Sequence, residues 1–286
     1  MILRTRSKDL DLSHHTHLMG VVNVTPDSFS DGGKYFDAPA AVAHAEELIR
    51  DGADLLDVGG ESSRPGADPV PLDEELRRVI PVIQELARRH PSVPLSIDTT
   101  KAEVARRAMR AGASLLNDIS ALRFDPGMAA VARETDVPVV LMHMQGNPRT
   151  MQTAPSYIDV VREIGSFFRE RLAFAEKTGI AADRLLLDPG IGFGKTLDHN
   201  LQILKNLRAL AEIGRPLVLG LSRKTFIARL LADGEKILSP QERSEGSLAG
   251  HLWAAAQGAH ILRVHDVRGT RRALRVWQAI ARGLAG

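Results

Sequence analysis

The sequence predicts an α/β protein whose simplest form is a (β/α)8 barrel, and two observations lead to this fold. Short apolar segments alternate along the chain with longer amphipathic ones. Polar residues gather where the apolar segments end, and in a parallel barrel all of these ends open on one face. We therefore expect residues 1–286 to form a single barrel domain, with residues 1–17 as an N-terminal extension. An open, doubly wound sheet is the alternative when strands alone are counted.

The apolar segments predict strands because each is short and is bounded by polar or Gly-containing segments. The expected strands are 18–24, 54–58, 94–98, 115–118, 137–142, 184–188, 216–221 and 260–264. The segments between them show the spacing of one-sided helices. The expected helices are 39–51, 73–89, 101–112, 126–135, 157–178, 198–212, 224–233 with 241–257, and 266–283. Gly52, Gly112 and Gly258 are expected to end helices in the left-handed conformation, and Asp266 to cap the last helix.

Composition restricts the classes of function. The chain has no cysteine, which excludes disulfides, thiolate catalysis and Cys-ligated zinc. A net charge of +2 gives no strong case for nucleic acid or an anionic membrane as partner. No apolar run approaches the roughly 20 residues that span a bilayer, and charged residues interrupt the N-terminus where a signal peptide would be apolar. We expect a cytoplasmic enzyme that acts on small molecules.

The segment from Leu18 to Tyr35 carries the first indication of chemistry. A buried strand is expected to end at Asn23, and the polar segment 25–33, rich in Gly and Pro, follows it directly. Such loops carry the chemistry of α/β barrels. A long surface turn is the alternative for this segment taken alone.

Asp98, Asn117 and Asp188 stand at the ends of three expected strands. Two carboxylates and a carboxamide suit a flat heterocycle with an amidine-like edge, because a carboxylate accepts two parallel N–H bonds from such an edge. The alternative for each is a cap on the helix that follows.

The segment Gly190–Thr196 fits neither the P-loop nor the dinucleotide pattern. Its glycines more simply let the backbone approach a flat ligand, with Phe193 available to stack.

Cationic residues follow the last two expected strands, where barrels commonly bind phosphate. Ser222, Arg223 and Lys224 follow the seventh strand, and Arg263 and His265 end the eighth. A salt bridge for Arg263 and a structural role for His265 are the alternatives.

Residues 61–66 follow the second expected strand and have the sequence Glu-Ser-Ser-Arg-Pro-Gly. They are interpreted either as a mobile loop that closes over a second substrate or as a solvated turn.

The histidines at 14, 15 and 17 lack the acidic partners of a metal site, so we do not expect them to bind a metal.

These segments together resemble the dihydropteroate synthases of the folate pathway. The resemblance runs from about Leu18 to the C-terminus. Its motifs occur in order: NVTPDSFSDGG (23–33), DVGGESSRPGA (57–67), SIDTTK (96–101), NDIS (117–120), LMHMQGNPRTMQ (141–152), LDPGIGFGKT (187–196), SRKTFI (222–227) and RVHDV (263–267). The resemblance implies a (β/α)8 barrel, a cytoplasmic homodimer and a sulfonamide target. It also implies a transferase that joins 6-hydroxymethyl-7,8-dihydropterin diphosphate to 4-aminobenzoate, with loss of pyrophosphate to a pterin cation followed by arylamine attack.

The resemblance also implies the roles of site residues. The pterin would be lined by Asp98, Asn117, Met142, Asp188, Phe193 and Lys224. The diphosphate would be held by Asn23, Arg64, Arg263 and His265, with Mg2+ at Asn23. The aminobenzoate pocket would be shaped by Thr25, Pro26, Ser63, Arg64 and Lys224. Catalysis would rest on Asp98, Lys224 and Arg263.

Ser63 departs from the family, which more often carries Thr there; the hydroxyl is kept and a methyl is lost.

Two other functions are possible on the same residues. A pterin-dependent methyltransferase that feeds a corrinoid would share the carboxylates but have less use for the diphosphate set. A non-catalytic paralogue would bind pterin without turnover.

Overall fold

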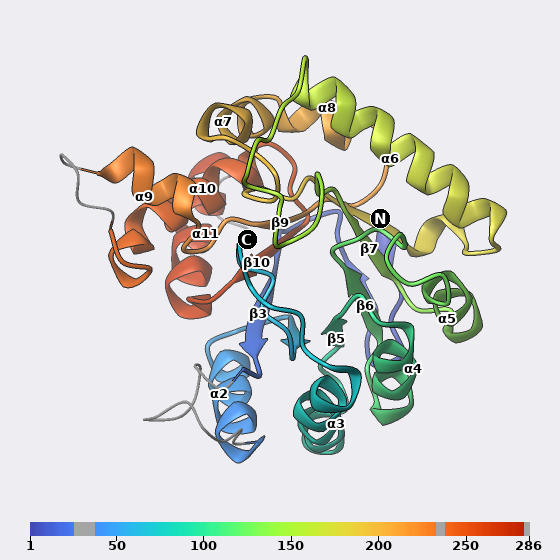
Figure 1. Ribbon diagram of the computed structural model, residues 1–286. Helices are drawn as coiled ribbons and strands as arrows, with labels where there is room; N and C mark the ends of the chain where they lie inside the picture. Colours follow the sequence, from blue (N-terminus) through green and yellow to red (C-terminus); the bar gives the residue numbers. More distant parts are fainter. Residues whose placement is uncertain (26–37, 233–237, 283–286) are drawn as a thin grey trace.

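A ring of parallel strands forms the centre of the molecule, with helices around it (Figure 1). The computed structural model describes residues 1–25, 38–232 and 238–282. The strands follow the order β8-β7-β6-β5-β4-β3-β10-β9, and a parallel bridge between Leu187 and Leu217 joins the two ends of this series. The barrel prediction is therefore confirmed over the open sheet. The strands are β3 His17–Asn23, β4 Leu55–Gly59, β5 Leu95–Asp98, β6 Leu115–Asp118, β7 Val139–Met142, β8 Leu185–Asp188, β9 Val218–Gly220 and β10 Ile261–Val264.

The helices lie close to their predicted ranges. They are α2 Ala38–Arg50, α3 Leu72–Arg89, α4 Ala102–Ala111, α5 Met128–Thr135, α6 Val160–Lys177, α7 Leu197–Lys205, α8 Leu207–Ala211, α9 Thr225–Leu231, α10 Ser244–Ala256 and α11 Val267–Arg282. The predicted caps are confirmed, since Gly52, Gly112 and Gly258 have φ of 100°, 118° and 97°. Asp266 Oδ1 accepts the N–H of Gly269 at 2.9 Å.

One predicted helix, 198–212, is wrong as a single element because it divides into α7 and α8 at Asn206. The backbone N–H of Asn206 donates to the carbonyl of Gln202 at 3.1 Å, and its side-chain Nδ2 donates to the same oxygen at 2.8 Å. A side chain that competes for backbone acceptors favours a helix end. Hydrophobic spacing does not detect this break, because the apolar face continues through it.

The N-terminal extension contains a hairpin that the sequence did not predict. β1 (Ile2–Leu3) pairs with β2 (Leu10–Asp11) in antiparallel fashion. Leu3, Leu10 and Leu12 are buried in one cluster with inward-facing side chains of the barrel, which are Met19, Leu55, Leu115, Val140, Leu186, Val218 and Ile261. The hairpin thus closes the N-terminal end of the barrel. Two-residue strands are too short to give a periodic signal in the sequence.

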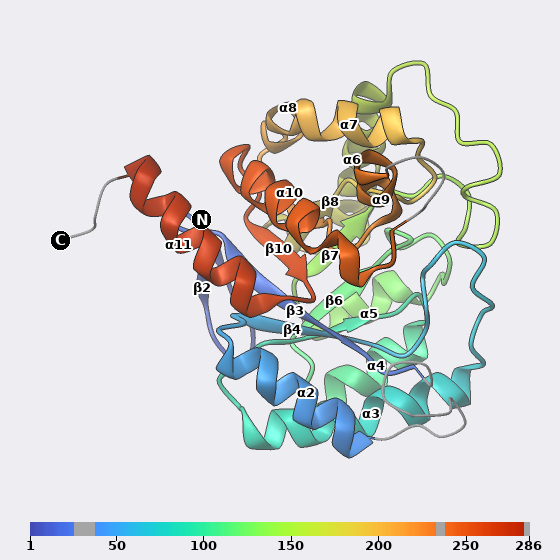
Figure 2. The ribbon, with the colours of Figure 1, turned by 90° about the vertical axis from the view of Figure 1, so that its left-hand side faces the viewer.

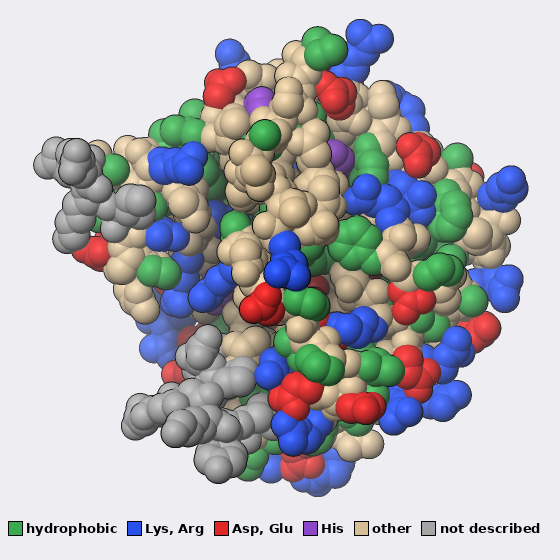
Figure 3. Space-filling model, in the orientation of Figure 1, with side chains coloured by type: hydrophobic (Ala, Val, Ile, Leu, Met, Phe, Trp, Pro, Cys, Tyr) green, Lys and Arg blue, Asp and Glu red, His purple; other side chains and the backbone are tan. Residues whose placement is uncertain are grey.

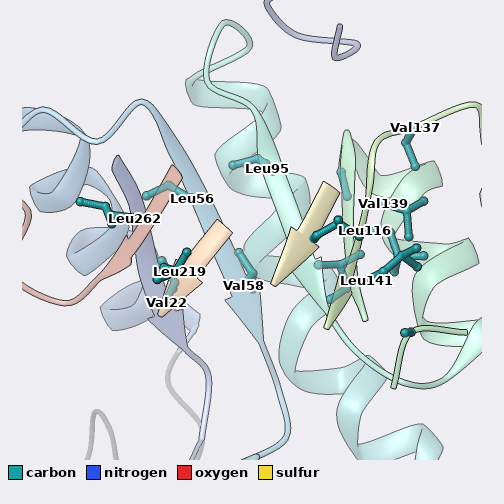
Figure 4. Close-up of a cluster of buried hydrophobic side chains, with 14 of the residues drawn as sticks. Val22, Leu56, Val58, Leu95, Leu116, Val137, Val139, Leu141, Leu219 and Leu262 are labelled. Atoms are coloured by element: carbon teal, nitrogen blue, oxygen red, sulfur yellow. The ribbon is translucent and has the colours of Figure 1, made fainter. Parts of the chain in front are cut away.

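Alternation along the strands separates an outer core from an inner one. Outward side chains such as Val58, Leu116 and Leu141 pack against the helices (Figure 4). The inward positions begin with the apolar cluster that the hairpin covers. Two residues further on, the same inward face carries polar side chains, because successive side chains of a strand point to opposite faces. These side chains are Asp57 on β4, Ser96 on β5, Asn117 on β6, Asp188 on β8 and Arg263 on β10.

The loops that follow β4 and β7 lie together on one side of the molecule, and the N-terminal hairpin lies on the other (Figure 2). The polar inward layer therefore opens toward these loops. On the face drawn in Figure 3, Lys and Arg are interspersed with Asp and Glu. None of the helices in the described ranges is long and apolar enough to cross a membrane.

The inner apolar cluster predicts a specific cost of truncation. Leu115 is fully buried in it, so Leu115→Ala is expected to lower the free energy of unfolding by about 2–5 kcal/mol. Leu72→Ala, at a position 39% exposed, is expected to cost less than about 1 kcal/mol. Urea unfolding of both variants measures this difference. Equal losses would show that the hairpin and the barrel interior do not pack as one core.

Candidate active site

Arg263 connects the buried carboxyl group of Asp57 with that of Asp98, whose side chain is 12% exposed, in the polar inward layer. Its Nε donates to Asp57 Oδ2 at 2.6 Å and its Nη2 donates to Asp98 Oδ2 at 3.0 Å. Asn117 Nδ2 donates to the same oxygen of Asp57 at 3.0 Å. Side chains from β4, β5, β6 and β10 therefore form one hydrogen-bonded group. The salt bridge considered for Arg263 is present, and 22% of its side chain stays exposed at the mouth.

Asp98 does not cap the helix that follows it. Residue Lys101 occupies the N-cap position of α4 and makes no side-chain cap bond, while Asp125 Oδ2 accepts the N–H of Ala102 at 2.8 Å. The Asp98 carboxylate is thus available to the mouth of the barrel and to Arg263. The capping alternative is excluded for this residue.

Burial and charge set the protonation of this group. Burial and the neighbouring charge of Asp57 raise the pKa of Asp98 to about 8. Burial lowers the pKa of Arg263, but the charges of Asp57 and Asp98 outweigh it and leave that pKa raised. The burial of Asp98 and the charge of Asp57 outweigh the charge of Arg263, so Asp98 holds its proton up to near neutral pH. Asp98 can accept a hydrogen bond as a carboxylate or donate one as an acid.

Asp188 and Lys224 are a pair of neighbouring charged groups, and Lys224 Nζ donates to the carbonyl of Ile191. Asp188, at the end of β8, is buried, and its Oδ1 accepts the N–H of Gly190 at 2.7 Å. Burial raises the pKa of Asp188 against the effect of Lys224. Burial also lowers the pKa of Lys224 to about 8, with Asp188 opposing the shift. Lys224 Nζ lies 4.7 Å from the ring centroid of Phe193, which is a cation–π distance.

The glycines after β8 are required by contacts within the protein. Gly190 and Gly194 have φ of 65° and 64°, and a Cβ on them would meet the carbonyl oxygens of His143 and Gln145 at 2.0 and 2.7 Å. The interpretation that these two glycines admit a flat ligand is therefore wrong, since they admit the chain that follows β7. At Gly192 the Cβ would instead face the side chain of a site residue, Lys224, at 3.4 Å.

The same loop carries Phe193 to an apolar surface beside the charged pair. The partly buried Phe193 packs against a cluster made of Ile119, Met142, Met144 and Met151. Aromatic and thioether side chains suit contact with a flat ring. The structure thus places Met142 and Phe193 in one cluster, with Phe193 beside Lys224 and Met142 in register with Asp188.

His265 lies among cations at the end of β10. Its Nδ1 is 2.9 Å from Ser222 Oγ. Burial, with the charges of Arg263, Arg223 and Arg64, lowers the pKa of His265 to about 3. A neutral imidazole surrounded by three guanidinium groups indicates a place for an anion.

Arg223 has a strained backbone that the sequence did not predict. Its φ of 61° lies in the left-handed region, which is uncommon for a non-glycine residue. Ser247 Oγ accepts its N–H at 3.0 Å, and Arg243 Nη1 donates to its carbonyl at 2.7 Å. Strain of this kind is kept where surrounding bonds fix the conformation, and it gathers at functional sites.

The remaining predicted residues lie at the rim of the mouth. Asn23, Thr25 and Ser63 are partly buried and Arg64 is exposed. Pro26 lies outside the described residues, as does the rest of segment 26–37. Asn23 is in register with Gly59 of β4. Within the described part of the chain, no three His, Cys, Asp or Glu side chains are placed to hold a metal ion.

Asp57 is the residue that sequence reasoning missed. Its position at a strand end was visible, but its burial and its bonds to Arg263 and Asn117 come from pairing across strands. One of its oxygens, Oδ1, is buried without a hydrogen-bond partner. A buried acceptor of this kind is costly unless a ligand or water satisfies it.

This chain is similar to known proteins over almost its whole length. The model of the family described as "Pterin binding enzyme" matches residues 19–265. The dihydropteroate synthase of Escherichia coli K12 is 51% identical over 279 residues, which cover 98% of this chain and 96% of that protein. The structure of Xanthomonas albilineans dihydropteroate synthase with 4-aminobenzoic acid has a TM-score of 0.90 at 51% identity and covers 98% of both chains.

Two further solved structures have other ligands in their descriptions. The same X. albilineans enzyme in complex with 7,8-dihydropteroate has a TM-score of 0.87 at 48% identity and covers 99% of both chains. Yersinia pestis dihydropteroate synthase in a sulfonamide drug complex has a TM-score of 0.92 at 47% identity, with 98% and 99% of the two chains covered.

The environment of His265 predicts an unusual titration. Because its pKa is lowered from 6.5 to about 3, the folded protein keeps the imidazole neutral while the unfolded chain binds a proton. This contribution to stability is present above pH 6.5 and is lost as the pH falls toward 3. In 1H–15N spectra of the imidazoles, assigned with His265→Asn, the His265 signal should stay neutral down to about pH 4. A midpoint near 6.5 would contradict the burial and the cationic surroundings.

Proposed function

This chain belongs to the dihydropteroate synthase family of pterin-binding enzymes, and from that membership we propose how its residues carry out the reaction. The enzyme joins 6-hydroxymethyl-7,8-dihydropterin diphosphate to 4-aminobenzoate and forms 7,8-dihydropteroate and pyrophosphate. The observation that carries the assignment of roles is the polar inward layer, where the buried carboxyl groups of Asp57 and Asp188 and the partly buried one of Asp98 meet a guanidinium and an ammonium at one mouth. Asp57 Oδ1 is buried in this layer without a hydrogen-bond partner, so the layer suits a polar ligand that can satisfy it.

The pterin binds between the carboxyl groups and the apolar surface. Asp188 accepts the N–H groups of the amidine-like edge, and Asn117 and Asp98 satisfy further polar atoms of the ring. Met142 and Phe193 pack on its faces. Lys224, held over Phe193 and next to Asp188, donates to an acceptor of the ring. Asp57 keeps Arg263 in place from below, through the 2.6 Å bond to its Nε.

Loss of pyrophosphate leaves a cation on the pterin methylene and negative charge on the leaving group. Arg263, Arg64 and His265 surround the position where that charge develops. A neutral His265 whose Nδ1 accepts from the Ser222 hydroxyl carries its proton on Nε2, where it donates to a phosphate oxygen. Asp98 and Asp188, in their ionised forms, favour the developing cation. The weakly basic arylamine then attacks, so no strong general base is needed.

The donor set fits Mg2+ only as a companion of the diphosphate. Mg2+ keeps several waters and is bound by one or two protein oxygens together with substrate phosphates. Asn23 would supply its amide oxygen at the end of β3. The metal, when bound, would neutralise charge on the leaving group. A site with a single protein ligand agrees with the described residues, in which no cluster of three acidic or histidine ligands occurs.

4-Aminobenzoate enters after the pterin, beside the exposed methylene. Thr25, Pro26, Ser63, Arg64 and Lys224 shape its pocket, with Ser63 supplying a hydroxyl. Sulfonamides would occupy the same pocket, since Y. pestis dihydropteroate synthase has been solved in a complex with such a drug.

We place the enzyme in the cytoplasm as a homodimer. Exposed apolar side chains gather on the contacting helices α9, α10 and α11, namely Leu230, Leu231, Trp253, Val276 and Ile280. Large exposed apolar residues on neighbouring elements favour a protein interface.

Turnover is the test of the proposed function. Sustained pyrophosphate release is expected only when both substrates and Mg2+ are present. The metal is needed to neutralise charge on the leaving group, and the arylamine is needed to trap the cation and complete each turnover. A coupled pyrophosphate assay measures it. Release that continues unchanged in excess chelator would exclude the metal, and pterin binding without turnover would indicate a non-catalytic paralogue.

Asp188→Asn tests the pterin site more cleanly than removal of Arg263, which would leave Asp57 and Asp98 without their cation. The amide keeps the shape and an acceptor for Gly190, but it loses the charged bidentate contact. Calorimetry is expected to show pterin binding weaker by about 1.5–3 kcal/mol with unchanged folding. Asp183→Asn, the same change at an exposed position, is the control. Native pterin affinity in the Asp188 variant would exclude the role.

A further inference from the structure

Glu61 closes the loop that carries Ser63 and Arg64. Its Oε2 accepts the N–H of Val70 at 3.0 Å, so the two ends of segment 61–70 are held together. We call this segment the 61–70 loop. Compact loops whose ends meet in this way are Ω-loops, and they are frequently functional. Just before Glu61, the carbonyl of Gly60 accepts from Arg78 Nη1 at 2.8 Å, which fixes the entry to the loop.

The same carboxylate is bound by Lys101, which connects the loop to the pterin side of the mouth. Lys101 Nζ donates to Glu61 Oε2 and, at 2.5 Å, to Glu75 Oε2. Glu75 is fully buried on α3, and its Oε1 accepts from Thr99 Oγ1 at 2.7 Å. Burial lowers the pKa of Lys101, but the bonds to both glutamates outweigh it and raise that pKa. Lys101 thus stays charged between two acceptors.

Lys101 is three residues beyond Asp98 on the same strand-end segment. The root of the 61–70 loop and the carboxyl group of the pterin site are therefore attached to one short piece of backbone. Ser63 and Arg64 follow Glu61 by two and three residues, so their positions depend directly on this anchor.

The far end of the loop is held more weakly. Gly66 donates its N–H to the carbonyl of Pro148 at 3.1 Å, and Arg149 approaches Asp68 at 3.7 Å. In Figure 2 this loop extends toward the loop that follows β7. The Arg149 and Asp68 side chains are 66% and 86% exposed, and exposed ion pairs contribute little. The partly buried Glu61 anchor, with 25% of its side chain exposed, is the stronger attachment.

We propose that Glu61 is a positioning residue for the second substrate, holding Ser63 and Arg64 in the orientation that receives 4-aminobenzoate. This inference rests on the proposed function. A loop anchored before the substrate arrives loses less conformational freedom on binding. Glu75 and Thr99 serve the anchor indirectly by keeping Lys101 in place. Glu61 itself touches neither substrate and acts through the loop.

The test compares Glu61→Ala with the unaltered enzyme. Glu61→Ala removes the loop closure but leaves the Lys101–Glu75 pair, so the buried Glu75 keeps its cation and the fold is retained. The KM for 4-aminobenzoate should rise about tenfold, while the Kd for pterin diphosphate should rise less than about threefold, because Arg263 and His265 keep their places when Arg64 is displaced. Deuterium uptake over 62–70 should increase, because the Val70 amide loses its acceptor.

Two further variants separate positioning from general stability. Glu61→Gln keeps an acceptor for Val70 and should restore most of the affinity for 4-aminobenzoate. Glu85→Gln makes the same change at an exposed ion pair on α3 and should leave all constants unchanged.

Two kinetic outcomes would overturn the inference. The first is an unchanged KM in Glu61→Ala despite faster exchange of the loop. The second is a parallel loss of affinity for both substrates. If the unaltered chain showed no condensation, the proposed function would fail, and calorimetry of 4-aminobenzoate with the pterin complex would still decide the role of Glu61.

Discussion

The pairing of Arg263 with Asp57 and Asp98 is the constraint on which the site depends. Three ionisable groups from three strands lie at the end of a barrel interior, and their burial is tolerable only because each bonds another. The bonds fix the guanidinium where a leaving group can reach it. Burial and the charge of Asp57 raise the pKa of Asp98 to about 8 against the effect of Arg263. The same contacts therefore hold the mouth together and set its chemistry.

The barrel makes this arrangement possible through its layers. An apolar inward layer, closed below by the N-terminal hairpin, supplies a rigid base. The next inward layer, two residues along each strand, is polar and meets the loops. Loops that differ in their attachments then complete the site: the glycine segment after β8 is locked against the backbone after β7, while the 61–70 loop is held by side chains.

The fold and much of the site could be predicted from the sequence because both depend on local patterns. Strand ends with polar residues identified Asp98, Asn117 and Asp188, and the motifs supplied their grouping. The missed features depend on contacts across the structure. Asp57 gains its importance from partners on β6 and β10, and the strain at Arg223 comes from bonds to α10 and the turn before it. The hairpin was missed because its strands are too short to show a period.

The hairpin at the N-terminal end of the barrel determines how substrates enter and how products leave. Leu3, Leu10 and Leu12 fill the N-terminal end, so the route to the polar layer runs through the opposite opening. Both substrates must therefore enter through that opening, and pyrophosphate and dihydropteroate must leave through it. Departure of the bulky product therefore has to precede entry of the next pterin, so each cycle includes a product-release step before the site can be refilled.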